Sequence, residues 1–85
     1  MNDLEKIKSE VMEFILKTSY VSEGSLTNET LIFAQGIMDS MGFMSLVSFL
    51  DERFMIKVKE TELIESNFES ISAISQYIIG KMNNN

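Results

Sequence analysis

Hydrophobic residues recur at the three- and four-residue steps of an α-helix in three stretches of the chain. The first stretch covers residues 3–18, the second covers residues 40–55, and the third begins at Ile71. Gly80 is expected to end the third helix, with residues 81–85 as a frayed tail. Because each helix has one apolar side, the three are expected to pack together. The apolar positions are Leu4, Ile7, Val11, Phe14 and Ile15, then Phe43, Leu46, Val47, Leu50 and Phe54, and finally Ile71, Ile74, Tyr77 and Ile78.

The connections between these stretches differ in kind. Residues 18–35 are rich in turn-forming side chains and predict a long loop, in which Leu31-Ile32-Phe33 is hydrophobic enough to pack over helix ends. Residues 56–59 predict a short non-helical link. Thr61 is a suitable cap for a brief helix that continues through residue 65. Residues 67–70 offer caps for the last helix. The pattern therefore predicts an all-α four-helix bundle, with three longer helices, one short third helix and a long loop between the first two.

The chain is short and acidic. Its 85 residues predict a single domain, residues 1–85, and 45% hydrophobic residues allow a small core. The 13 acidic residues against 7 basic ones give a net charge of −6. This charge disfavours nucleic-acid binding, which needs a basic surface. It favours protein partners that present basic patches.

The chain contains no cysteine and no histidine. It therefore lacks a thiolate nucleophile, a Cys/His zinc site and a Ser-His-Asp triad. We expect neither catalysis nor a bound metal. No apolar run reaches the roughly 18 residues of a membrane span, and no signal peptide is visible. A cytoplasmic protein without a membrane span is expected, and we expect it to be a monomer.

One short stretch carries candidate chemistry: residues 36–41, Gly-Ile-Met-Asp-Ser-Met. Gly36 interrupts the preceding structure. Asp39 and Ser40 favour a helix start, because their side-chain oxygens can accept from the free N–H groups of the first turn. The Ser40 hydroxyl is thus expected at the beginning of the second helix, just after a loop. A phosphate ester there would meet the positive end of the helix dipole and unpaired N–H donors.

This stretch resembles the attachment site of the acyl carrier protein family, in which a Gly, two apolar residues, Asp-Ser and an apolar residue open the second helix. The resemblance covers residues 26–79 and includes Leu31-Ile32-Phe33, residues 54–58 and the acidic segment before residues 67–71. It implies the acyl-carrier-protein-like four-helix bundle. It also implies that a phosphopantetheinyl transferase attaches 4′-phosphopantetheine from coenzyme A to Ser40.

The family's function follows from that arm. Its thiol would hold acyl or aminoacyl groups as thioesters, which supplies the sulfur that the sequence lacks. The resemblance implies that the chain passes these groups between loading and transferring enzymes of fatty-acid, polyketide, peptide or related biosynthesis. Tethering raises the concentration of the cargo at each enzyme's active site.

The identity of the cargo stays open. Housekeeping fatty-acid carriers usually have acids in the first turns after the serine, whereas this chain has Gly42, Phe43 and Ser45 there, and its next acid is Asp51. The turn from Asp39 to Gly42 is similar to that of carriers of D-alanine and of other stand-alone aminoacyl carriers. The 6 Phe and 7 Met leave little obvious room for a long acyl chain. This favours a small or polar cargo.

The helix expected over residues 40–55 has a second face, opposite the face that joins the core. Met41, Met44, Ser45, Ser48 and Glu52 fall there at helical spacing. Exposed methionines suit an adaptable docking surface, although Met41 or Met44 could instead fold inward as core filler. The residues expected to recognise enzymes with basic docking patches are Asp39, Met41, Met44, Ser48, Asp51 and Glu52.

Other interpretations stay open for several residues. The chain could be an unmodified helical interaction module with the same fold, in which Ser40 is only a helix cap. A hydrolase that uses Ser40 would lack a His or Lys base nearby in the sequence. Gly42 either allows close packing against the preceding loop or gives clearance for the arm. Phe49 falls between the two faces of the helix, and the pattern does not place it.

Overall fold

Helices make up the regular structure of the chain, as the hydrophobic pattern predicted. The computed structural model describes residues 3–19 and 21–83, and within these ranges it contains helices and no strand. None of the helices in this part of the chain is both long enough and apolar enough to cross a membrane. In chain order the elements are α1 (Asp3–Thr18), the 3₁₀ turn η1 (Glu23–Ser25), α2 (Ser40–Phe54), the 3₁₀ turn η2 (Glu60–Glu62), α3 (Glu65–Phe68) and α4 (Ile71–Asn83).

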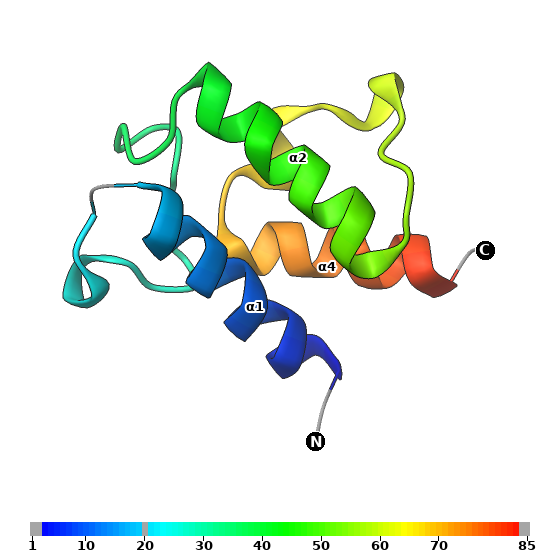
Figure 1. Cartoon of the computed structure of the whole chain (residues 1–85), viewed down its shortest axis with the longest axis horizontal. Coiled ribbons are helices and arrows are strands. Elements are labelled where there is room, and N and C mark those ends of the chain that lie inside the picture. Colours follow the sequence, from blue (N-terminus) through cyan, green and yellow to red (C-terminus); the bar gives the residue numbers. More distant parts are fainter. Residues whose placement is uncertain (1–2, 20, 84–85) are drawn as a thin grey trace.

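Three helices build the core. α1 packs most extensively against α4, and α2 lies alongside α1 and also contacts α4 (Figure 1). Each helix buries one apolar stripe, because residues three and four apart share a face. The predicted stripes are confirmed at their centres, whereas Leu4, Phe14, Phe43, Phe54 and Tyr77 are only half-buried. The buried residues of the stripes are Ile7, Val11 and Ile15 on α1, Leu46, Val47 and Leu50 on α2, and Ile71, Ile74 and Ile78 on α4.

The long loop before α2 is pinned to the bundle rather than free. Ile32 is fully buried, and its N–H donates to the carbonyl of Glu69 at 2.9 Å. The Ile32 carbonyl in turn accepts from the N–H groups of Ile37 and Met38. Gly36 makes this tight return possible, because its φ of +70° lies in the left-handed region that favours glycine. The loop thereby fixes the point at which the chain enters α2.

The short helix lies later in the chain than predicted. Thr61 does not cap a helix over residues 62–65. It lies inside η2, and α3 follows at Glu65–Phe68. A tight turn forms first because the Glu62 carboxylate accepts from the Lys59 N–H at 2.9 Å, while the Glu62 N–H donates to the Lys59 carbonyl. Asn67, predicted as a cap, is inside α3.

The last helix begins as predicted but ends later. The Ser70 hydroxyl caps it by accepting from the Ala73 N–H at 3.1 Å. Gly80 does not stop α4, which continues to Asn83, so the predicted helix end is wrong. The extension is anchored by Lys81, whose ammonium pairs with the Glu62 carboxylate at 3.0 Å. Residues 84–85 lie outside the described part of the chain.

Candidate functional site

Asp39 and Ser40 begin α2 in the way the sequence predicted. Asp39 has an extended backbone (φ −102°, ψ −173°), and its Oδ1 accepts from the Gly42 N–H at 2.8 Å. Its carbonyl accepts the first helical hydrogen bond, from the Phe43 N–H at 2.9 Å. Asp39 is therefore the N-cap, and Ser40 is the first residue with helical geometry.

The Ser40 side chain is exposed at this helix end. Within the described chain, its hydroxyl has no hydrogen-bond partner, and the N–H groups of Ser40 and Met41 have no backbone acceptor. The N-terminus of a 15-residue helix carries a partial positive charge and attracts anions. A phosphate ester on Ser40 would find free N–H donors and open space, so the residues present fit that group.

Gly42 lies close to the loop that precedes α2. A Cβ at this position would lie 3.0 Å from Cγ of Met38 and 3.4 Å from Oδ1 of Asp39. Met38 is buried, so it cannot easily move away. Of the two interpretations of Gly42, close packing against the preceding loop is supported by these distances.

The predicted partner face of α2 is mostly exposed. Met41 and Met44 have 81% and 57% of their surface exposed, so the alternative that they fill the core is wrong. Ser48 and Glu52 lie exposed further along the same helix. Asp51 differs from the expectation for this face, because it is half-buried and its Oδ1 accepts from the Val58 N–H at 3.1 Å. Its carboxylate is engaged in holding the link after α2.

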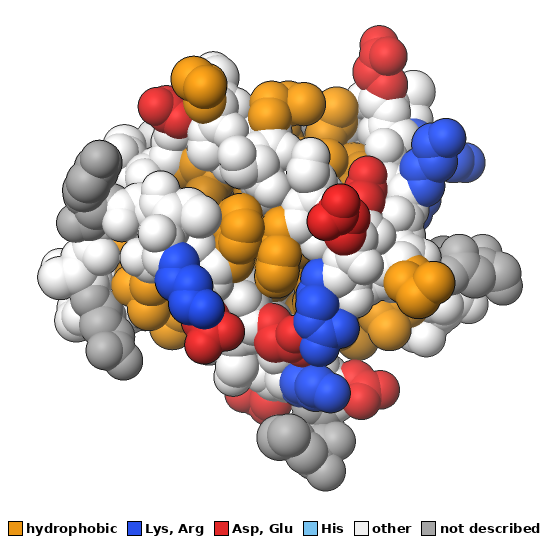
Figure 2. Space-filling view, in the orientation of Figure 1, with side chains coloured by type: hydrophobic (Ala, Val, Ile, Leu, Met, Phe, Trp, Pro, Cys, Tyr) orange, Lys and Arg blue, Asp and Glu red, His pale blue; other side chains and the backbone are white. Residues whose placement is uncertain are grey.

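Phe49, which the pattern did not place, packs between α1 and α2. Its ring stacks on Phe14, with centroids 4.3 Å apart and an interplanar angle of 14°. Figure 2 shows hydrophobic side chains gathered over the valley between these two helices, with charged side chains along one edge. A shallow depression of about 600 Å³ runs along this valley. Its lining residues are Phe14, Thr18, Met44, Ser45, Ser48, Phe49 and Glu52.

An aromatic groove opens one helical turn beyond Ser40. It has a volume of about 380 Å³, and its lining includes Phe33 from the loop, Phe43 from α2 and Phe68 from α3. The Phe43 ring contacts both of the others edge-on, at 5.4 Å from Phe33 and 5.3 Å from Phe68. Sequence reasoning missed this groove. It counted phenylalanines as filling the core, whereas these three meet at the boundary between separate elements.

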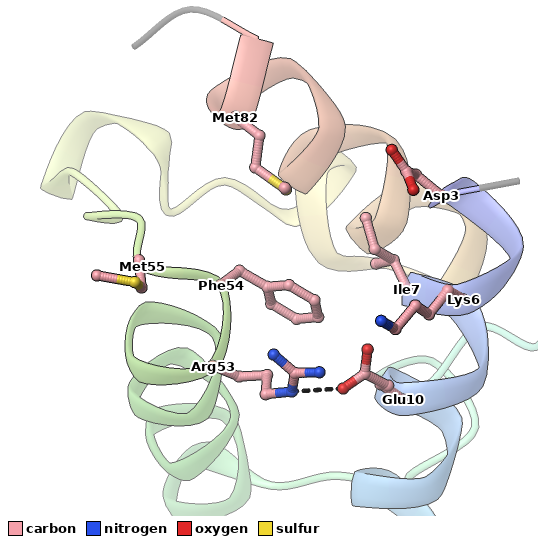
Figure 3. A pocket seen from close by; sticks show the side chains of 8 residues that line it. All are labelled: Asp3, Lys6, Ile7, Glu10, Arg53, Phe54, Met55 and Met82. Atoms are coloured by element: carbon pink, nitrogen blue, oxygen red, sulfur yellow. Dashed lines mark ion pairs between the residues drawn. The ribbon is translucent and has the colours of Figure 1, made fainter.

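A third pocket lies at the opposite end of α2 from Ser40 (Figure 3). It has a volume of about 270 Å³ and mixes apolar and charged lining residues. Arg53 forms an ion pair with Glu10 and lies 5.5 Å from the centre of the Phe54 ring. Met55, by contrast, points away from the pocket in Figure 3 and is 86% exposed. No periodic pattern along the chain indicates this pocket, because its lining comes from the ends of three helices.

Compared with models of known protein families, the chain matches none. The chemical possibilities of the site therefore rest on the start of α2 and on the surfaces beside it. These offer one exposed hydroxyl at a helix N-terminus, an exposed methionine face and an aromatic groove one turn away.

Proposed function

We propose that this chain is a carrier protein of the acyl carrier type, with 4′-phosphopantetheine attached to the Ser40 hydroxyl. The observation that carries the proposal is the exposed, unpaired Ser40 hydroxyl at the first turn of α2, directly after the capping Asp39. It occurs within the sequence Gly-Ile-Met-Asp-Ser-Met, residues 36–41, which is similar to the attachment site of that family. Both features are needed, since an exposed serine at a helix start is common by itself.

The chain's own contribution to attachment is an accessible nucleophile. A phosphopantetheinyl transferase would bind the start of α2 and take the proton from the Ser40 hydroxyl. The serine oxygen would then attack the phosphorus next to the pantetheine of coenzyme A and form the phosphoester bond, while the P–O bond of the pyrophosphate breaks and 3′,5′-ADP leaves. The arm supplies a thiol that can hold an acyl or aminoacyl group as a thioester. The N–H groups at the helix start would stabilise the negative charge of the phosphoester.

The exposed face of α2 is the proposed docking surface for partner enzymes. Met41 and Met44 offer polarizable side chains that adapt to different partners. Asp39, Ser48 and Glu52 supply polar and acidic contacts around them, and the net charge of −6 favours enzymes with basic patches. We propose small, short-lived contacts made by a monomeric carrier in the cytoplasm, because a carrier must leave each enzyme after transfer.

The aromatic groove bears on the cargo. It opens within one helical turn of Ser40 and is lined largely by apolar side chains, including Phe33, Phe43, Leu63 and Phe68. Such a lining would shelter a short apolar acyl group from water. The groove therefore favours a short apolar acyl group as cargo, whereas the composition alone favoured a small or polar one.

Attachment is tested by mass spectrometry of the intact protein. The purified chain is incubated with coenzyme A, Mg²⁺ and phosphopantetheinyl transferases of different specificity. We expect a mass increase of one phosphopantetheine group, and no increase for Ser40→Ala. Ser9→Ala is the matched control, because it removes an exposed serine hydroxyl from α1, outside the proposed docking surface. No gain with several active transferases, or a gain that survives Ser40→Ala, would contradict the proposal.

A second function is favoured by the exposed methionines. The face formed by Met41 and Met44 is available without any modification, as an unmodified helical interaction module would require. The same mass measurement separates the two functions. An interaction module would gain no mass, and substitution of Met44 rather than Ser40 would abolish binding to its partner.

A further inference from the structure

The pocket at the C-terminal end of α2 is formed where three helix ends meet (Figure 3). Its lining includes Lys6 and Ile7 from α1, Arg53 and Phe54 from α2, and Met82 from α4. We call it the α2-end pocket. Its volume of about 270 Å³ is slightly below the range of about 300–1,000 Å³ that is typical of sites for drug-sized ligands. A ligand of this pocket must therefore be a small molecule.

One side of the α2-end pocket is apolar. Ile7 is 3% exposed and belongs to the hydrophobic core, so its position is fixed by packing. The Phe54 ring is half-buried, and the Met82 side chain is 42% exposed. Met82 can adapt to a ligand, because its side chain is unbranched and flexible. An alkyl chain placed on these three residues would remove part of the exposed Phe54 and Met82 surface from water.

Arg53 supplies hydrogen-bond donors to the same pocket. Its Nε pairs with the Glu10 carboxylate, and its guanidinium carbon lies 5.5 Å from the centre of the Phe54 ring. These two contacts orient the planar guanidinium before any ligand binds. The Nη groups of Arg53 form no hydrogen bond with any residue that the structure describes. They therefore remain available as a fork of donors, whose geometry matches the two oxygens of a carboxylate.

Lys6 adds a second cation to the pocket, and Asp3 adds an acid. In Figure 3 the Lys6 ammonium points into the pocket, toward the side that Arg53 lines. Neither Lys6 nor Asp3 forms an ion pair within residues 3–19 and 21–83. The charge of Glu10 is already balanced by Arg53. The free donors of Arg53 and Lys6 therefore outnumber the free acid, which favours an anionic ligand over a cationic one.

We propose that the α2-end pocket binds a small aliphatic carboxylate. The carboxylate lies against Arg53 and Lys6, and the alkyl chain covers the apolar side formed by Ile7, Phe54 and Met82. The charged group thus meets donors that no described residue uses, while the chain meets exposed apolar surface. The pocket lies at the opposite end of α2 from the serine that begins the helix, so this binding does not depend on attachment of an arm there.

The test is a titration of the unmodified full-length chain, followed by NMR at constant pH and salt concentration. Hexanoate, 1-hexanol and hexylamine are compared, because they share one alkyl chain and differ only in the charge of the head group. The methyl signals of Ile7 and Met82 report binding. The variants are Lys6→Gln and Arg53→Lys, which keeps the charge but loses the fork of donors. Lys57→Gln is the matched control, because it removes the same charge from an exposed residue outside the pocket.

We expect hexanoate to bind with a Kd of about 1 mM, 1-hexanol more weakly, and hexylamine most weakly of the three. Lys6→Gln should weaken hexanoate binding about two- to fivefold, the range expected for one exposed ion pair. Arg53→Lys should weaken it about tenfold, because a bidentate contact is lost. Asp3→Asn should strengthen it about two- to fivefold, because a like charge is removed. Lys57→Gln should leave the affinity unchanged.

Three results would overturn the proposal. Hexylamine or 1-hexanol could bind as tightly as hexanoate, which would show that Arg53 and Lys6 do not select a carboxylate. Lys6→Gln and Lys57→Gln could weaken binding equally, which would show a response to net charge rather than to a site. Finally, the Ile7 and Met82 signals could fail to saturate with hexanoate, which would show that the pocket does not bind this class of ligand.

Discussion

A buried serine in α4 gives the sharpest test of the packing. Ser75 is fully buried, and its hydroxyl has no hydrogen-bond partner within the described residues. It lies on α4 between the core residues Ile71 and Ile78, on the helix that packs most extensively against α1. An unpaired buried hydroxyl costs about 1–3 kcal/mol in proteins, as estimated from mutational data. The substitution Ser75→Ala removes that cost.

The expected gain follows from three terms. Removing the unpaired hydroxyl contributes about 1–3 kcal/mol, and replacing Ser by Ala within a helix adds a few tenths. The small void that remains opposes these by up to about 1 kcal/mol. We therefore expect Ser75→Ala to raise the free energy of unfolding by about 1 kcal/mol. For a domain of this size that corresponds to an increase in Tm of about 4–8 °C.

Ser70→Ala is the matched control. Ser70 is also buried, but its hydroxyl caps α4 by accepting from the Ala73 N–H. The same chemical change there should lower stability by about 1 kcal/mol. The changes in the free energy of unfolding of the two variants should thus have opposite signs and differ by about 2 kcal/mol. Urea and thermal unfolding, followed by circular dichroism, measure both. A loss of 1 kcal/mol or more in Ser75→Ala would refute the argument that this hydroxyl is unpaired.

Three further predictions concern other helix ends and Glu62. Met55 has a left-handed backbone (φ +54°) and an exposed side chain, so Met55→Gly should raise the free energy of unfolding by about 0.5–1 kcal/mol, whereas Met55→Ala should not. Urea unfolding measures both variants, and a lower stability of Met55→Gly would contradict this prediction. Asp39→Ala should lower the free energy of unfolding by about 1 kcal/mol, because α2 loses its cap. Asp39→Asn keeps an acceptor oxygen, so in the same assay it should retain most of the wild-type stability. Hydrogen bonds from the Lys59 N–H and the Lys81 ammonium lower the folded-state pKa of Glu62 from 4.5 to about 2, so the ionised carboxylate stabilises the fold above pH 4.5, and this stabilisation is lost as the pH falls toward 2. The difference in Tm between the wild type and Glu62→Gln should therefore shrink between pH 4.5 and pH 2. A difference that stays constant over this range would contradict the lowered pKa.

The start of α2 was predictable because its determinants are local. Asp39 caps the helix with a side chain that reaches only three residues along the chain, and Gly36 supplies a backbone conformation that few other residues adopt. The exposure of Ser40, Met41 and Met44 follows from helical periodicity once the core side of α2 is known. Short-range rules of this kind need no knowledge of the other helices.

The predicted helix boundaries were wrong where a particular side-chain contact, near or far along the chain, decided the outcome. Gly80 was expected to end α4, but Lys81 continues the helix because it reaches a carboxylate 19 residues earlier in the chain. Thr61 was a reasonable cap by its residue type, yet the hydrogen bonds of Glu62 place a tight turn there and α3 follows it. Asp51 was expected beside the partner face, and the structure adds that its carboxylate accepts from the Val58 N–H in the link after α2. A periodic pattern contains none of this information.

By itself, the sequence determined three long helices, their buried faces and a serine at the head of the second. These features depend on spacing and on contacts within a few residues, so the order of the amino acids specifies them. Only the tertiary structure decided where the short helix forms, how Phe14 and Phe49 fill the space between α1 and α2, and that an aromatic groove opens beside Ser40. Those features arise where separate elements meet, and their energies depend on side chains that the folded chain alone brings together.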